Sequence, residues 1–176
     1  MQRTCLGFVS LVLLLSLAAP AAAENVDIPE YKMWSGWREG ATATGKTEGE
    51  AEGMKMTFTT ISTLKKVTAE KVTLEVVTIT EFGGQKVKTP PTLVDIPAKG
   101  PKPPAAPKSK ETKGKETLTV NGKRLDCEWT QVEVKGGEVT KTWTCKDVPG
   151  GVVKATTRSP TTTATSQLLV WKGEKR

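Results

Sequence analysis

The sequence predicts an all-β protein, an antiparallel meander of about eight or nine strands that curls into a half-barrel or barrel-like sheet. Three observations support this prediction. Thr, Val and Lys alternate over several stretches, as in half-buried strands. Turn signals rich in glycine separate these stretches. No stretch has the sustained 3.6-residue apolar repeat of an amphipathic helix, and only residues 28–34 favour a short helical turn.

The alternating stretches and the turns between them define the expected strand order. The strands are expected at residues 54–67, 71–80, 116–120 and 166–171. The turns are expected at Gly83-Gly84, Asn121-Gly122, Gly136-Gly137 and Pro149-Gly150-Gly151. Asn121-Gly122 is typical of a two-residue type I′ turn, which places Leu118 opposite Leu125. Both leucines are therefore expected on the inner face of the sheet.

A second hairpin is predicted by the sequence CEWTQVEVKGGEVTKTWTC (127–145), which is nearly symmetrical about its glycines. A hairpin centred on Gly136 places Cys127 opposite Cys145 and Trp129 opposite Trp143. Strand side chains alternate between faces, so all four share the inner face with Leu118 and Leu125. We expect a disulfide between the cysteines, worth about 3 kcal/mol in the chain-entropy model. A redox or metal site is disfavoured because the pair lacks C-x-x-C spacing and the chain has no histidine.

The N-terminus is typical of a signal peptide. Arg3 precedes an apolar stretch at residues 6–17, and Ala21-Ala22-Ala23 matches the A-x-A cleavage pattern. We expect residues 1–23 to be removed after Ala23, although an uncleaved anchor helix is the alternative. The protein is then secreted or periplasmic, with residues 24–176 forming a single domain. Loss of Arg3 lowers the net charge of +7 by one, and the remaining charge favours anionic surfaces without identifying a partner.

One long interruption, PAKGPKPPAAPKSKETKGK (97–115), offers almost nothing to bury. Its Pro, Lys and Ala residues predict an extended, polyproline-like surface loop. The loop is either a solvated connector or a lysine-rich segment that holds an anionic polymer, such as a nucleic acid or an envelope polysaccharide.

The stretch GATATGKT, Gly40–Thr47, fits the phosphate-binding loop pattern G-x-x-x-x-G-K-[ST]. A phosphate loop needs a buried strand before it and a helix after it, so that backbone N–H groups face the phosphates. The following residues, 48–53, include two glycines and three glutamates, which disfavour both a helix and a triphosphate. We therefore interpret Gly40–Thr47 as a polar strand leading into a turn, and expect no nucleotide.

The composition argues against catalysis. The absence of histidine excludes Ser-His-Asp triads, Cys-His pairs and His-ligated zinc. There is no G-x-S-x-G motif, and the carboxylates are scattered singly among lysines along the expected strands. We expect a protein that is not an enzyme and has no catalytic, cofactor-binding or metal-binding residues.

Four segments carry a resemblance to a known group: WSGWREGA (34–41), TLKKVTAEKVTLEV (63–76), GGQKVKTPP (83–91) and TWTCKDVPGGVVK (142–154). They resemble a group of small secreted bacterial β-rich proteins, which implies no activity or site. More loosely, a secreted antiparallel meander is similar to the LolA-like lipoprotein-carrier half-barrels. That second likeness concerns architecture, and it implies an apolar concavity that holds acyl chains.

Two functions follow as expectations. The first is a non-enzymatic binding or structural module of the cell envelope or extracellular space. The second is a carrier that holds a lipophilic ligand in the concave face of a half-barrel. The partner is therefore an anionic envelope polymer, a protein surface or a lipid. The candidate ligand-lining residues are Trp34, Trp37, Met54, Met56 and Phe58, with ordinary core packing as their alternative role.

Overall fold

The computed structural model describes residues 25–51, 54–102, 109–134 and 136–176. This part of the chain contains one short helix, α1 (Pro29–Ser35), close to the predicted helical turn. It also contains twelve strands: β1 (Asn25–Asp27), β2 (Thr42–Ala51), β3 (Met54–Val67), β4 (Lys71–Phe82), β5 (Gln85–Lys88), β6 (Thr92–Pro97), β7 (Lys99–Pro101), β8 (Ser109–Val120), β9 (Lys123–Val134), β10 (Val139–Thr144), β11 (Val152–Arg158) and β12 (Thr162–Lys172).

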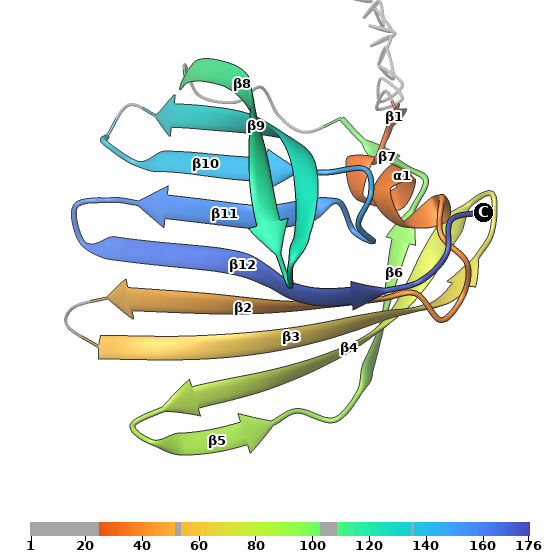
Figure 1. Cartoon of the computed structure of the whole chain (residues 1–176), viewed down its shortest axis with the longest axis horizontal. Coiled ribbons are helices and arrows are strands. Elements are labelled where there is room, and N and C mark those ends of the chain that lie inside the picture. Colours follow the sequence, from red (N-terminus) through yellow and green to blue (C-terminus); the bar gives the residue numbers. More distant parts are fainter. Residues whose placement is uncertain (1–24, 52–53, 103–108, 135) are drawn as a thin grey trace, which may run out of the picture.

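Ten of the strands form one antiparallel sheet, so the protein is all-β as predicted (Figure 1). Their order is β5-β4-β3-β2-β12-β11-β10-β9-β8, with β6 pairing with β4 beside β5. The chain thus forms two meanders, β2 to β5 and β8 to β12, which the pairing of β2 with β12 joins. β5 and β8 lie at opposite ends of this order, and the sheet is not a closed barrel.

Most of the predicted strands and turns are confirmed. β3 coincides with residues 54–67, while β4 and β12 contain residues 71–80 and 166–171. The Asn121-Gly122 turn has positive φ at both positions, 48° and 75°, as a type I′ turn requires. The twelve strands exceed the expected number because β1, β5, β6 and β7 are short and lack a strong alternating pattern.

The predicted loop at residues 97–115 is corrected by the structure. β7 occupies Lys99–Pro101, and β8 already begins at Ser109. β8 pairs with β9 along its whole length, from Ser109 opposite Val134 to Val120 opposite Lys123. The exposed side chains at the start of β8 give no burial signal, but its main chain still completes a ladder. Residues 103–108 lie outside the described part of the chain.

The core consists of two clusters of buried residues. The hairpin cluster lies where the end of the β8–β9 hairpin crosses β10 to β12 (Figure 1), and its buried residues are Val120, Leu125, Cys127, Trp143, Cys145, Val148, Val153 and Leu168. The helix cluster lies under α1 and contains Trp34, Trp37, Ala41, Leu64, Val72 and Leu74. Ala43 packs against both clusters, so they are continuous.

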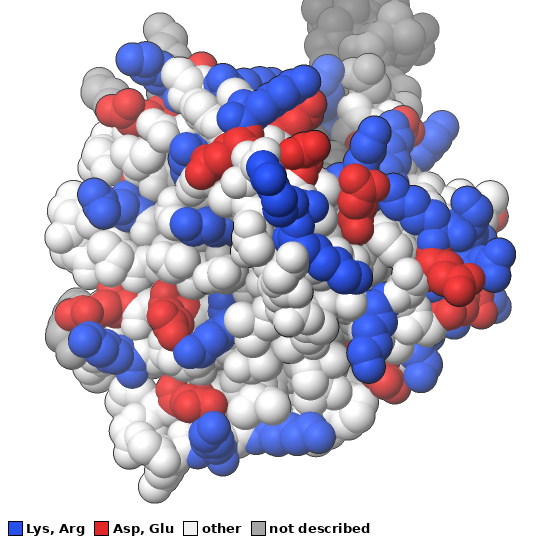
Figure 2. Space-filling model, in the orientation of Figure 1, with Lys and Arg blue, Asp and Glu red and all other residues white. Residues whose placement is uncertain are grey.

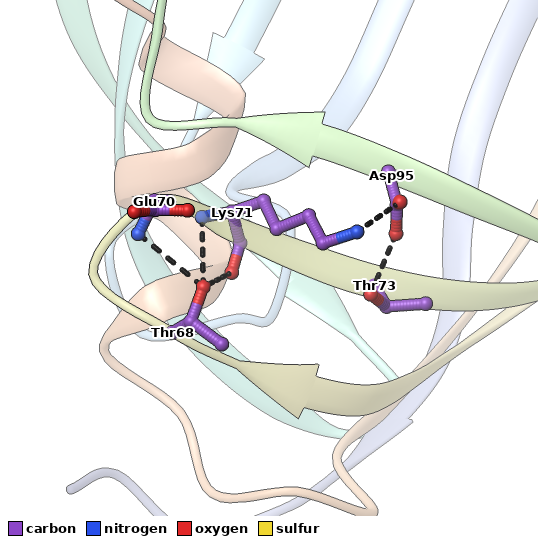
Figure 3. A network of polar contacts seen from close by, with 5 residues as sticks. All are labelled: Thr68, Glu70, Lys71, Thr73 and Asp95. Atoms are coloured by element: carbon purple, nitrogen blue, oxygen red, sulfur yellow. Dashed lines mark hydrogen bonds and ion pairs between the residues drawn. The ribbon is translucent and has the colours of Figure 1, made fainter.

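A polar network fixes the turn between β3 and β4 and ties β6 to it (Figure 3). The Thr68 hydroxyl accepts hydrogen bonds from the backbone N–H groups of Glu70 and Lys71, at 3.3 and 3.0 Å. From β4, Lys71 Nζ and Thr73 Oγ1 reach the two carboxylate oxygens of Asp95 on β6, at 2.5 and 2.6 Å. These hydrogen bonds hold the edge strand β6 in register with β4.

Candidate functional site

The predicted hairpin is present in the predicted register. Trp143 lies directly opposite Trp129 in the ladder between β10 and β9. Cys127 and Cys145 are both buried, on the core side of the hairpin, and both are free thiols in this structure. Burial, together with the adjacent Cys145, raises the pKa of the Cys127 thiol to about 11. The register therefore brings the two cysteines together, and the disulfide itself stays a prediction.

The interpretation of Gly40–Thr47 as a polar strand is confirmed from Thr42 onward, where β2 begins. A turn directly after Thr47 is not formed, because β2 continues to Ala51 without a helix. Both edges of this strand are paired, because Lys46 lies opposite Gln167 of β12 and Thr59 of β3. Lys46 Nζ forms an ion pair with Glu48 at 2.5 Å. The backbone N–H groups that a phosphate loop would direct at a ligand are used within the sheet.

The five candidate ligand-lining residues do not line one cavity. Trp34 and Trp37 are buried in the helix cluster, where they pack as core residues. Met54, Met56 and Phe58 lie at the other end of β3, and Met54 is 51% exposed. The sequence places these residues close together along the chain, but the length of β3 separates the two groups in space.

A pocket lies between α1, β9, the β10–β11 loop and the C-terminal residues. We call it the helix pocket; its volume is about 640 Å³. Its apolar lining includes Met33, Trp37 and Val148, and of the two cysteines Cys145 also borders it. Only Trp37 among the predicted ligand-lining residues contributes to it.

One wall of the helix pocket comes from β9. Leu125 and Cys127 face the hairpin cluster, so Asp126 and Glu128 project from the other face of the strand. Both carboxylates border the helix pocket and are exposed. The alternation of buried and exposed residues along β9 is the sequence signal from which the outward direction of these two carboxylates follows.

The β10–β11 loop reaches the pocket because two glycines let it approach α1 closely. A Cβ at Gly151 would lie 2.5 Å from Met33 Sδ, and one at Gly150 would lie 3.0 Å from the Trp34 ring. Both glycines have positive φ, 75° at Gly150 and 70° at Gly151. This contact holds Val148 and Lys146 at the pocket.

The C-terminal residues close the remaining side. Lys175 forms an isolated antiparallel bridge with Trp37, and the Arg176 N–H donates to the Gly36 carbonyl at 2.9 Å. The Lys175 ammonium pairs with Asp147 and lies 5.8 Å from the centroid of the Trp37 ring. No local sequence signal connects residues so far apart in the chain, so Lys175 could not be predicted as a site residue.

The charged groups of the helix pocket are separated by sign. Asp126 and Glu128 lie on the β9 wall, while the lysines come from the other segments: Lys32, Lys146 and Lys175. Figure 2 shows blue and red side chains interspersed over the face that it draws. In β8, for example, Lys113 pairs with Glu111 at 2.8 Å. Binding of an anionic polymer to the lysine-rich segment stays a prediction.

The described residues contain no group of three or more His, Cys, Asp or Glu side chains placed to hold a metal ion. Within the same ranges no helix has the length and apolar character to cross a membrane. No protein-family model matches the chain, and no curated protein matches it either.

Proposed function

We propose that this chain is an exported, non-enzymatic binding module of the cell envelope or extracellular space, and that its ligand occupies the helix pocket. The pocket itself is the observation that supports this proposal. Its volume of about 640 Å³ falls in the range of small-molecule sites, roughly 300 to 1,000 Å³. It also combines apolar side chains with a few charged groups, which is the usual composition of such sites.

Binding is favoured over catalysis by the chemistry of the lining. The chain has no histidine, the residue that most often acts as a general base. The Cys145 thiol at the pocket is buried, and reactive cysteines are usually partly exposed. The lining thus provides contacts for recognition, and no activated nucleophile.

A lipid carrier is the second candidate, and one observation favours it. Met56 and Phe58 follow the same alternation as Leu64, so they lie on the core face of the sheet. The register places Phe82 beside Met56, and Phe82 is 51% exposed. Together with Met54 and Val87, these side chains form an uncovered apolar area that we call the distal patch. An acyl chain lying along the sheet would contact it.

Native mass spectrometry of the exported protein, purified from its source, tests the proposal. We expect a non-covalently bound small molecule that is released on denaturation. Gly36 lines the helix pocket, its φ of −77° suits any residue, and no atom lies within 4 Å of a Cβ built on it. Gly36→Phe should therefore fill the pocket and abolish binding without disturbing the fold.

Phe82→Ser on the distal patch is the matched control, and it should retain the ligand. Loss of the ligand in Phe82→Ser but not in Gly36→Phe would instead favour the carrier. Both candidates are overturned if the purified protein carries no bound small molecule and takes up none from an extract of its source.

A further inference from the structure

The helix pocket is lined by charges of both signs, which come from different segments that we call its two walls. The β9 wall carries Asp126 and Glu128, and the second wall, made of α1, the β10–β11 loop and the C-terminal residues, carries Lys32, Lys146 and Lys175. The lining also includes the buried apolar side chains of Trp37 and Val148, which are 5% and 1% exposed. An arrangement of this kind selects for two features of a ligand at once: separated charges of both signs and an apolar body.

The two walls do not neutralise each other. Among the ion pairs of the described residues, none joins Asp126 or Glu128 to one of the lysines that line the pocket. Asp126 accepts a hydrogen bond from Thr117 at 2.9 Å, and Glu128 lies 4.0 Å from Lys115, both on β8. The two β9 carboxylates therefore make their contacts with β8 and not with the lysines of the pocket.

Two of the three lysines pair with carboxylates that are not part of the pocket lining. Lys32 pairs with Asp27 at 2.8 Å, and Lys175 pairs with Asp147. Lys146 is exposed and forms no ion pair or hydrogen bond with any described residue. It is thus the cation at the pocket whose charge has no counterpart within the structure.

We propose that the helix pocket binds a short peptide with free termini and apolar side chains. This inference rests on the proposed function and specifies its ligand. The peptide ammonium lies against Asp126 and Glu128, and its carboxylate lies against Lys146. Its apolar side chains pack on Met33, Trp37 and Val148. Charged hydrogen bonds at both ends fix the orientation, and the apolar contacts supply the area that is removed from water.

Isothermal titration calorimetry on the exported protein tests this ligand class. The probes are leucyl-leucine and trileucine, with free leucine to measure how much the peptide length contributes. Three analogues each lack one feature: N-acetyl-leucyl-leucine lacks the ammonium, leucyl-leucine amide lacks the carboxylate, and glycyl-glycine lacks the apolar body. We expect each analogue to bind at least about tenfold more weakly than leucyl-leucine, which corresponds to about 1.4 kcal/mol.

Variants test which charged residues contact the ammonium and which contact the carboxylate of the peptide. Asp126→Asn with Glu128→Gln should weaken leucyl-leucine but leave the already weak N-acetyl analogue unchanged. Lys146→Met should weaken leucyl-leucine but leave the amide unchanged. Lys88→Met, an exposed lysine on β5 far from the pocket lining, is the control and should change neither affinity. Unchanged melting temperatures verify that the variants fold.

Two results would overturn the inference. Equal affinity for leucyl-leucine and its blocked analogues would show that the charged residues of the pocket do not bind the peptide termini. Absence of peptide binding, while a co-purified ligand is lost in Gly36→Phe, would refute the peptide but leave the binding module intact. If neither peptide nor co-purified ligand binds, the proposed function fails as well.

Discussion

Trp143 lies directly opposite Trp129, and the ammonium of Lys141 lies 4.5 and 4.1 Å from the two ring centroids. Trp143 is 6% exposed, and its Nε1 donates to Glu116 of β8 at 2.7 Å. The Trp143 indole therefore packs in the hairpin cluster, makes a cation–π contact with Lys141 and ties the cluster to β8 by its hydrogen bond to Glu116.

Replacing Trp143 should destabilise the domain strongly. We expect Trp143→Ala to lower the free energy of unfolding by about 3 to 5 kcal/mol, because it leaves a cavity in the hairpin cluster. Trp143→Phe keeps most of the packing and loses the hydrogen bond to Glu116, so it should cost less. Urea unfolding followed by circular dichroism measures both. Equal losses for the two variants would mean that packing of the indole contributes little.

The pairing of Trp129 with Trp143 belongs to the half of the fold that could be predicted from the sequence. Asn121-Gly122 and Gly136-Gly137 are turn signals with defined geometry, and they fix which residues of β8, β9 and β10 face each other. The pairing of β2 with β12 has no such signal, because no short turn connects these strands. The strand at Ser109 was missed for a related reason, since its exposed side chains carry no burial pattern.

The candidate site was predictable only in part. Asp126 and Glu128 alternate with buried Leu125 and Cys127, so their outward direction followed from the strand pattern. The helix pocket, however, is assembled from four segments that lie far apart in the chain. Lys175 is held there by its bridge to Trp37 and its ion pair with Asp147, and a sequence gives no local signal for such long-range contacts.

If the chain is exported as proposed, it should contain a Cys127–Cys145 disulfide. The hairpin register places both buried thiols side by side, and an oxidising compartment favours the bond. The intact mass should be lower by the two thiol hydrogens, and reduction should cost up to about 3 kcal/mol of stability. The stability of a Cys127→Ala, Cys145→Ala double variant should not respond to reductant. Two titratable thiols in the denatured, unreduced protein would refute the bond.

The reduced protein should have an unreactive Cys127. Burial raises the pKa of this thiol to about 11, so it stays protonated at neutral pH, and the thiolate is the reactive form. Alkylation by iodoacetamide should be much slower than for a free cysteine at pH 7, and should accelerate as the pH approaches 11. Mass spectrometry of the labelled peptide measures the rate. Labelling at the rate of free cysteine would indicate that the hairpin opens readily.

Gly114→Ala should destabilise the β8–β9 hairpin. A Cβ at this position would lie 2.5 Å from Cζ2 of Trp129, whose ring Lys141 contacts. The ring must move, so we expect a loss of about 1 to 3 kcal/mol in the free energy of unfolding. Gly45→Ala in β2 is the matched control, because its Cβ would meet Gln167 O at an ordinary 3.7 Å. The prediction fails if both variants are equally stable.

The network at β6 should make stability depend on pH through Asp95. The hydrogen bond from Lys71, followed by that from Thr73, lowers the pKa of this carboxyl below its ordinary value of 3.8. A lowered folded-state pKa stabilises the fold above pH 3.8, and this contribution is lost as the pH falls through the folded value. The melting temperature of wild type should exceed that of Asp95→Asn at neutral pH, and the difference should shrink in acid.

Lys71→Met provides the control for Asp95, because it removes the first cause of the shift and leaves the carboxyl in place. NMR titration of the Asp95 carboxyl carbon should give a higher midpoint in this variant than in wild type. Since the network is exposed, salt should weaken the difference as well. An unchanged midpoint would mean that the Thr73 hydrogen bond alone holds the carboxylate, so that Lys71 is not needed to keep β6 against β4.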